Sequence, residues 1–261
     1  MLTSLQNPLI KQLRKLHRAK ERREQQLFLL EGTHLLEEAY AAQAALETVC
    51  HTEVWRSQHP MLWQSLTSIA RRVELVSSDV LKAIATTVEP DGVVATAERI
   101  HAQPLHFTQL GLMLETIQDP GNLGTIIRTA AAAGAEGLLI SDDSVDLDNP
   151  KVLRSSAGQW FRLPMAVSAD LTADVLKCKA AGMQVISTVP TAPQTFWEVD
   201  FHQPTLVLLG NEGAGLSQAL NDLADRQVTI PLSRGVESLN VAISAALILY
   251  EVKRQRGQKN C

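Results

Sequence analysis

The sequence predicts an α/β protein in which a small α/β domain, residues 1–97, precedes a larger domain built on a parallel sheet, residues 110–261. From residue 111 onward, apolar strand-like runs alternate with stretches of helical periodicity, which is typical of a parallel sheet covered on both faces. The first domain shows a shorter alternation of the same kind. Residues 98–109 have weak periodicity and contain a proline, so we expect them to form a linker.

The first domain is expected to open with a helix. Asn7 can cap this helix and Pro8 suits its first turn. Leucines then recur at helical spacing, at Leu9, Leu13 and Leu16. Apolar runs predict strands at 27–32, 46–50, 73–76 and 91–98. Helical periodicity predicts helices at 33–43, 60–70 and 78–85.

The second domain is expected to alternate strands and helices to its end. Its strands are predicted at 111–117, 136–141, 162–167, 183–187, 205–210 and 226–232. Its helices are predicted at 121–134, 149–157, 170–181 and 239–256. The last helix shows only Asn240 and Ser244 as polar groups up to residue 250, so we expect it to be buried.

Composition indicates an ordinary soluble globular protein. Hydrophobic residues make up 45% of the chain and charged residues 20%, so it can bury a core without a disulfide or a metal. Cys50, Cys178 and Cys261 are scattered and show no metal-ligand spacing, which favours a reduced, cytoplasmic compartment and no zinc. No signal peptide and no run of about 18 apolar residues occurs, so no membrane span is expected.

The distribution of charge is uneven. The net charge is −4, yet residues 11–23 hold seven Lys or Arg against one Glu, and the C-terminal tail at 253–259 is also basic. A local basic patch can attract the phosphates of RNA or DNA even when the whole chain is acidic. A solvated helix face or a frayed terminus explains the same pattern, so both interpretations stay open.

In a parallel sheet, ligands bind outside the carboxyl ends of the strands, and three loops there carry unusual residues. In the first loop, 118–130, glycines and a helix N-terminus precede Arg128, which is compatible with a ligand site. The alternative is that Asn122 only caps the helix and Arg128 is an ordinary surface cation. The second loop, 208–217, exposes Gly-rich backbone around Glu212. Such backbone could bind a flat heterocycle or a ribose, or the glycines could serve only to form a turn. Neither matches the dinucleotide-binding or P-loop fingerprint.

The third loop, 231–240, has too many polar groups for a simple helix entry. Ser238 can act as the N-cap with Asn240 in the first turn, but capping leaves Arg234 and Glu237 unexplained. Because unpaired buried polar groups cost about 1–3 kcal/mol each, this cluster favours a ligand site.

Taken together, the three loops resemble the SpoU (TrmH-like) RNA 2′-O-ribose methyltransferases of the SPOUT superfamily. The resemblance rests on PGNLGTIIRTA, LLGNEGAGLS and IPLSRGVESLNVAISAALILYE, with DNPKVLRSSAGQWFRLP between them and FLLEG in the first domain. It spans essentially the whole chain. It implies a small RNA substrate-binding domain followed by a methyltransferase domain with a deep trefoil knot.

The resemblance also implies the roles of individual residues. The family's catalytic positions fall on Asn122, Arg128, Glu212, Ser238 and Asn240. Its binding positions for S-adenosylmethionine fall on Thr188, Leu209, Gly210, Asn211, Gly213, Ile230, Leu232, Ser238 and Leu239. It further implies a homodimer, no metal, and transfer of a methyl group to a ribose 2′-OH of RNA, with ribosomal RNA favoured over transfer RNA.

Two other functions remain open at this point. A catalytically inert RNA-binding or ribosome-assembly protein could retain the same fold, although every polar residue of the motifs is present. An unrelated nucleotide-dependent α/β enzyme is disfavoured because no phosphate-loop fingerprint occurs. We expect Arg234 to contact an RNA phosphate or to point to water, and the loop sequence does not decide between these.

Overall fold

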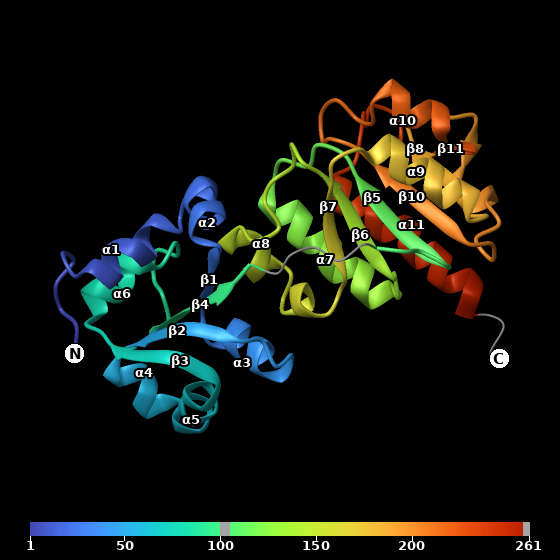
Figure 1. Cartoon of the computed structure of the whole chain (residues 1–261). Helices are drawn as coiled ribbons and strands as arrows, with labels where there is room; N and C mark the ends of the chain where they lie inside the picture. The colour runs from blue at the N-terminus through green and yellow to red at the C-terminus, as the bar shows by residue number, and fades with distance from the viewer. Residues whose placement is uncertain (100–104, 258–261) are drawn as a thin grey trace. The chain divides into compact units, whose positions relative to one another are not determined.

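A computed structural model describes residues 1–99 and 105–257 as two compact units (Figure 1). The first unit contains residues 1–99 and 146–161, and the second contains 105–145 and 162–257. Much of the expected linker, residues 100–104, lies outside the described residues, as do the end of the basic tail and Cys261. The expected limits of 1–97 and 110–261 stay a prediction, and residues 146–161 lie with the first unit.

The first unit is built on a mixed sheet of four strands in the order β1-β4-β2-β3. Its strands are β1 (Leu27–Glu31), β2 (Leu46–His51), β3 (Ala70–Leu75) and β4 (Val93–Glu98). Its helices are α1 (Pro8–Lys15), α2 (Ala19–Gln25), α3 (Thr33–Ala41), α4 (Glu53–Gln58), α5 (Pro60–Ile69), α6 (Ser78–Ile84) and α8 (Pro150–Ser155). A short 3-10 helix follows at Gln159–Phe161.

Alternation along β1 sends side chains to two separate cores. Phe28 and Leu30 pack in the core that contains residues of α3, α4 and α5. Leu29 packs on the opposite face with residues of α1 and α6. The period of two is that of a strand buried on both faces. The expected opening helix is confirmed as α1, and Asn7 caps it by accepting a hydrogen bond from Leu9 N at 2.9 Å.

Residues 146–161 are tied into the first unit by charge and by packing. The Arg22 side chain, 2% exposed, donates to Asp148 at 3.0 Å and to Asp146 at 2.9 Å. Arg154 donates to the buried Glu31 at 2.9 Å. Leu153 joins the core under α3. The segment 146–161 is therefore an integral part of the first unit, although it lies in the second half of the sequence.

The second unit contains a seven-stranded sheet in which every ladder is parallel, as the sequence predicts, in the order β7-β6-β5-β10-β8-β11-β9. Its strands are β5 (Leu110–Leu114), β6 (Gly137–Ser141), β7 (Met165–Ser168), β8 (Gln184–Thr188), β9 (Gln194–Thr195), β10 (Thr205–Leu209) and β11 (Arg226–Thr229). Its helices are α7 (Pro120–Ala133), α9 (Leu171–Ala180), α10 (Gln218–Leu223) and α11 (Val241–Gly257), with a 3-10 helix at Phe196–Glu198.

Helices cover both faces of this sheet (Figure 1). Apolar residues of α9 and α10 pack with Met113, Leu206 and Leu208 on one face. Helices α7 and α11 pack against each other on the other face. This arrangement leaves the loops at the carboxyl ends of the strands uncovered by these helices.

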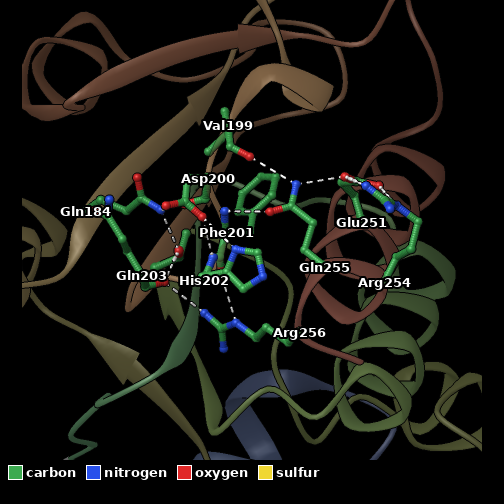
Figure 2. Close-up of polar contacts among 11 residues, drawn as sticks. Gln184, Val199, Asp200, Phe201, His202, Gln203, Glu251, Arg254, Gln255 and Arg256 are labelled. Carbon is green, nitrogen blue, oxygen red and sulfur yellow. Dashed lines mark hydrogen bonds and ion pairs between the residues drawn. The ribbon is translucent and has the colours of Figure 1, made fainter. Parts of the chain in front are cut away.

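The end of α11 is fastened to the segment that leads into β10, as Figure 2 shows. The buried Gln255 side chain accepts from Phe201 N at 2.8 Å and donates to Val199 O at 3.0 Å. Arg256 donates to Phe201 O at 2.8 Å and to Gln109 O at 3.1 Å. The helix that begins beside the carboxyl ends of the strands is thus anchored at its other end near the amino ends of β5 and β10.

Three sequence predictions for the second unit need correction. The strand predicted at 226–232 ends at Thr229, because Pro231 has no N–H to continue the ladder. The last helix begins at Val241 rather than 239. It is also not buried on all sides: in the single chain, a stripe of its apolar side chains is exposed.

Candidate functional site

The three loops predicted from the sequence meet at one edge of the second unit's sheet. Strands β5 and β10 are neighbours whose last residues, Leu114 and Leu209, pair in register. Strand β8 lies between β10 and β11. Because all these strands are parallel, the loops that follow β5, β10 and β11 emerge at the same edge.

A chain of side-chain hydrogen bonds joins the three loops. Asn122, in the first turn of α7, donates from Nδ2 to Glu212 Oε1 at 3.0 Å. Asn240, from the third loop, donates from Nδ2 to Asn122 Oδ1 at 2.8 Å. We call Glu212, Asn122 and Asn240 the loop relay. It links residues that are up to 118 positions apart in the sequence.

The direction of the loop relay is fixed by its two ends. The Glu212 carboxylate only accepts hydrogen bonds, so the NH₂ group of Asn122 must face it. The Oδ1 atom of Asn240 accepts from Ala242 N at 2.9 Å and Ile243 N at 3.4 Å, which leaves the Asn240 NH₂ group to face Asn122. Asn240 is therefore the N-cap of α11. The expectation that Ser238 caps this helix is wrong.

The surroundings of Glu212 favour its ionised form. Burial alone would raise the pKa of this carboxyl. Hydrogen bonds from the Asn122 side chain and from backbone N–H groups, including those of Asp119 and Gln118, lower its pKa below the ordinary value. The negative charge strengthens the bond to Asn122, since hydrogen bonds to ionised acceptors are stronger than neutral ones.

The second loop folds back tightly on itself. Asn211 and Gly215 exchange two backbone hydrogen bonds of 3.0 Å. The Asn211 Oδ1 atom accepts from Gly213 N and Ala214 N, each at 2.9 Å, and its Nδ2 donates to Thr116 O at 2.8 Å. A Cβ atom on Gly210 would lie 2.2 Å from the backbone of Gly215, so glycine is required there. Asn211 therefore shapes its own loop and ties it to the first.

The third loop leaves its peptide groups available. Within the described residues, the backbone of 231–239 makes one hydrogen bond, from Val236 N to Ser233 O at 3.2 Å. That bond closes a turn with Arg234 and the left-handed Gly235 at its centre, the pattern of a type II turn. The free donors and acceptors of the loop can therefore serve a ligand.

The structure does not connect every predicted residue to the loop relay. Arg128 and Ser238 are exposed, and neither side chain has a hydrogen bond or ion pair within 1–99 and 105–257. Arg234 is likewise exposed at its turn. Arg128 lies on α7 six positions beyond Asn122, which in a helix places it about 120° around the axis from Asn122.

The predicted cofactor residues lie at the ends of β8, β10 and β11. Leu209 is buried at the end of β10, and Thr188 is half-buried at the end of β8. Ile230, Leu232 and Leu239 are half-buried in the third loop. They form part of the same edge as the loop relay and give it apolar surface beside open backbone groups.

Sequence reasoning missed two residues of this edge. Glu115 accepts from Ser217 N at 2.6 Å and so ties the first loop to the start of α10. Thr116 has a left-handed backbone (φ +55°) and receives the Asn211 side chain. Both were placed inside the strand predicted at 111–117, but β5 ends at Leu114, so both follow it at the ligand edge.

Two classes of site receive no support from the described part of the chain. It contains no group of three or more His, Cys, Asp or Glu side chains that could hold a metal ion. None of the helices described is long and apolar enough to cross a membrane.

Comparison with known proteins gives the family. The model of the SpoU rRNA methylase family matches residues 109–250, and that of the MRM3-like substrate binding domain matches residues 7–95. An uncharacterized tRNA/rRNA methyltransferase of Synechocystis is 49% identical over 98% of this chain and 94% of its own length. A 23S rRNA guanosine 2′-O-methyltransferase of Bacillus subtilis is 32% identical over 97% of this chain and 98% of its own.

Solved structures agree over the same length. The AdoMet-bound rRNA methyltransferase from Sinorhizobium meliloti superposes with a TM-score of 0.86 at 30% identity, covering 97% of both chains. The similarity therefore includes both units and the edge that carries the loop relay. With a family model across more than half of its length and a relative 49% identical along nearly all of it, this chain belongs to the SpoU rRNA methylase family.

Proposed function

We propose that this chain is an S-adenosylmethionine-dependent RNA methyltransferase that methylates a ribose 2′-OH. The observation that carries the proposal is the loop relay, which assembles the three family motifs into one site at the ligand-binding edge of the sheet. The Bacillus relative is named for 2′-O-methylation of 23S rRNA, and the Sinorhizobium relative was solved with AdoMet bound. Nothing favours the inert alternative, since every motif side chain is present.

The cofactor edge fits S-adenosylmethionine. Peptide groups of 231–239 without hydrogen-bond partners in the described chain suit the polar edges of an adenine and an amino acid. Half-buried Ile230, Leu232 and Leu239 suit the flat face of the base. We assign the binding positions to these residues together with Thr188, Leu209, Gly210, Asn211, Gly213 and Ser238. When bound, the cofactor would supply the methyl group of its sulfonium. The C–S bond of that methyl group breaks as its bond to the ribose oxygen forms.

Arg128 would act on the RNA. Its guanidinium stays protonated, so it cannot serve as an ordinary base. As an exposed cation without a partner in the described chain, it is available to bind a phosphate next to the target ribose and to stabilise negative charge developing on the 2′-oxygen. The proton of the hydroxyl then leaves to water as the new bond forms.

Ser238 and Asn240 would have different roles in the third loop. The hydroxyl of Ser238 is exposed and has no partner in the described chain, so it can position the ribose hydroxyl. The Asn240 amide already serves the α11 cap and Asn122, so its role is to hold the loop and the helix start in place. Glu212 and Asn122 would likewise position the loops rather than touch the substrate.

Three further properties belong to the proposal. The resemblance supports a deep trefoil knot in the C-terminal part of the second unit. An exposed apolar stripe on α11 supports a homodimer: Ile243, Leu247 and Tyr250 recur at i, i+4 and i+7 and are 50%, 40% and 51% exposed. The free thiols of Cys50 and Cys178 support a reduced, cytoplasmic setting.

Mapping of 2′-O-methylation in total RNA from cells with and without the gene tests the function and its substrate. We expect one ribose site to be unmethylated without the gene, in ribosomal RNA rather than transfer RNA. A site lost from transfer RNA would correct the substrate. An unchanged map of both RNA classes would contradict the function.

A further inference from the structure

One face of α1 concentrates positive charge. Ile10 and Leu13 bury the opposite face against the core shared with α6. Three exposed cations lie on α1 at i, i+3 and i+4, a spacing that brings residues of a helix to one side, and a fourth, Arg18, follows the helix as the N-cap residue of α2. We call them the α1 cationic face: Lys11, Arg14, Lys15 and Arg18.

These four cations differ from their neighbours in having no partner. Within residues 1–99 and 105–257, none of their side chains makes a hydrogen bond or an ion pair. The cations that follow are all engaged: Lys20 with Glu24 at 3.7 Å, Arg22 with Asp148 at 3.0 Å, and Arg23 with Asp146 at 2.5 Å. Within residues 11–23, the cations of α2 are therefore paired with carboxylates, and the four cations before it are not.

Local electrostatic interactions do not explain why the four cations of the α1 cationic face lack a partner. Like charges at i and i+4 destabilise a helix, and Lys11 and Lys15 have this spacing within α1. The dipole of α1 favours Arg14 and Lys15 in its last turn. It does not favour Lys11, and Arg18 is the N-cap of α2, where the dipole disfavours a cation. Lys11 and Arg18 therefore have no local electrostatic stabilisation in the free protein.

We propose that the α1 cationic face binds the phosphate backbone of the RNA substrate, outside the methyl-transfer site. The inference rests on the proposed function for the choice of RNA as the polyanion. An acidic chain with net charge −4 gains little non-specific attraction to RNA from its total charge, so attraction depends on a local cluster such as this one. Phosphates relieve the repulsion among the four cations, and their contact carries no sequence information.

The test compares the full-length wild type with the double variant Lys11→Gln, Lys15→Gln. Glutamine is a good helix former, so α1 should remain folded, with thermal stability equal to the wild type or higher. Binding to a short fluorescein-labelled RNA hairpin is measured by anisotropy over a series of salt concentrations. The slope of log affinity against log salt should fall by about 0.7–0.9 for each cation removed, a loss of roughly tenfold or more near 0.1 M salt.

A matched control removes two charges from the same unit. Arg71→Gln, Arg72→Gln neutralises exposed cations of β3 that already pair with Glu47, Glu98 and Glu74. This control should keep the RNA affinity and the salt slope of the wild type. Equal affinity and slope in the Lys11, Lys15 variant, or an equal loss in the control, would overturn the proposal. So would loss of binding to phosphatidylserine vesicles alone, with RNA affinity retained.

Parallel measurements separate this surface from the catalytic proposal. Titration with S-adenosylmethionine should give the same affinity in all three proteins. Methyl transfer should show a raised KM for RNA in the Lys11, Lys15 variant and little change in kcat. If even the wild type transfers no methyl group to any RNA, the proposed function fails, while the anisotropy comparison still decides whether this face binds RNA.

Discussion

At the scale of single residues, Asn122 holds two opposite hydrogen bonds, one donated to Glu212 and one accepted from Asn240. The amide does both at once, whereas a carboxylate lacks the donor and an alanine lacks both groups. The resemblance to the family predicted that Asn122, Glu212 and Asn240 belong to one site, and the loops that carry them follow parallel strands. It did not predict that they contact one another, because that depends on side-chain geometry between distant segments.

Replacing Asn122 with Asp should make methyl transfer depend on pH. The new carboxylate would lie about 3 Å from Glu212, so one of the two pKa values must rise. Below that raised pKa, a shared proton restores the contact. Above it, repulsion opens the loops, and activity at neutral pH should fall about tenfold or more. Asn122→Ala is the control and should lose activity without a new pH step. Identical pH profiles of the two variants would contradict the loop relay.

His51 should make the stability of the first unit depend on pH. It is 2% exposed, its Nδ1 contacts Thr52 O at 3.1 Å, and its Nε2 accepts from Trp63 Nε1 at 3.2 Å, which requires the neutral ring. Burial is the largest cause of its lowered pKa. Above about pH 6.5 the ring is neutral in both folded and unfolded chains. Below that, only the unfolded chain gains the proton readily, so the free energy of unfolding should fall with falling pH.

Tryptophan fluorescence during thermal unfolding measures this effect. Three of the four tryptophans lie in the first unit, so the signal reports mainly on that unit. His51→Gln should be less stable at neutral pH and should lose less stability on acidification. The exposed His34→Gln is the control and should follow the wild type. A His51 variant with the same acid response as the wild type would assign the response to other groups.

At the scale of elements, the agreement between sequence and structure follows the range of the interactions. Apolar periodicity is a local signal, and it located most strands and the three long helices of the second unit, α7, α9 and α11, to within a few residues. The two-residue β9 and the short α10 gave too little pattern to be predicted. The local pattern gave no end for the opening helix, and the burial of Arg22 by Asp146 and Asp148, more than 120 residues away, has no local signal.

The end of α11 depends on one buried amide. Gln255→Ala leaves Phe201 N–H and Val199 C=O without their partner, at a cost of about 1–3 kcal/mol for a buried unsatisfied group. We expect a loss of that size in the free energy of unfolding of the second unit, measured by urea denaturation. Gln218→Ala removes an amide with a surface contact to Asp222 and should change stability by less than about 0.5 kcal/mol. Equal effects of the two substitutions would contradict the anchoring role.

At the scale of the whole molecule, the sequence predicted that α11 is buried, and the single chain leaves Ile243, Leu247 and Tyr250 exposed. In the proposed homodimer, a second copy of the chain would cover this stripe. Leu247→Glu should therefore shift the protein from dimer to monomer in size-exclusion chromatography with light scattering. Leu176→Glu, at a 50% exposed leucine on α9, is the control and should remain dimeric. A monomeric wild type, or a dimeric Leu247 variant, would contradict the homodimer.

The proposed methyl transfer is tested most directly by measuring transfer from tritium-labelled S-adenosylmethionine to unmodified ribosomal RNA by wild type and Arg128→Ala. We expect label in ribose 2′-O-methyl groups with the wild type, and a loss of about a hundredfold or more in the variant if Arg128 stabilises negative charge on the reacting oxygen as proposed. Isothermal titration should give nearly equal cofactor affinity for both proteins. Transfer at the wild-type rate by Arg128→Ala would rule out the proposed catalytic role of Arg128.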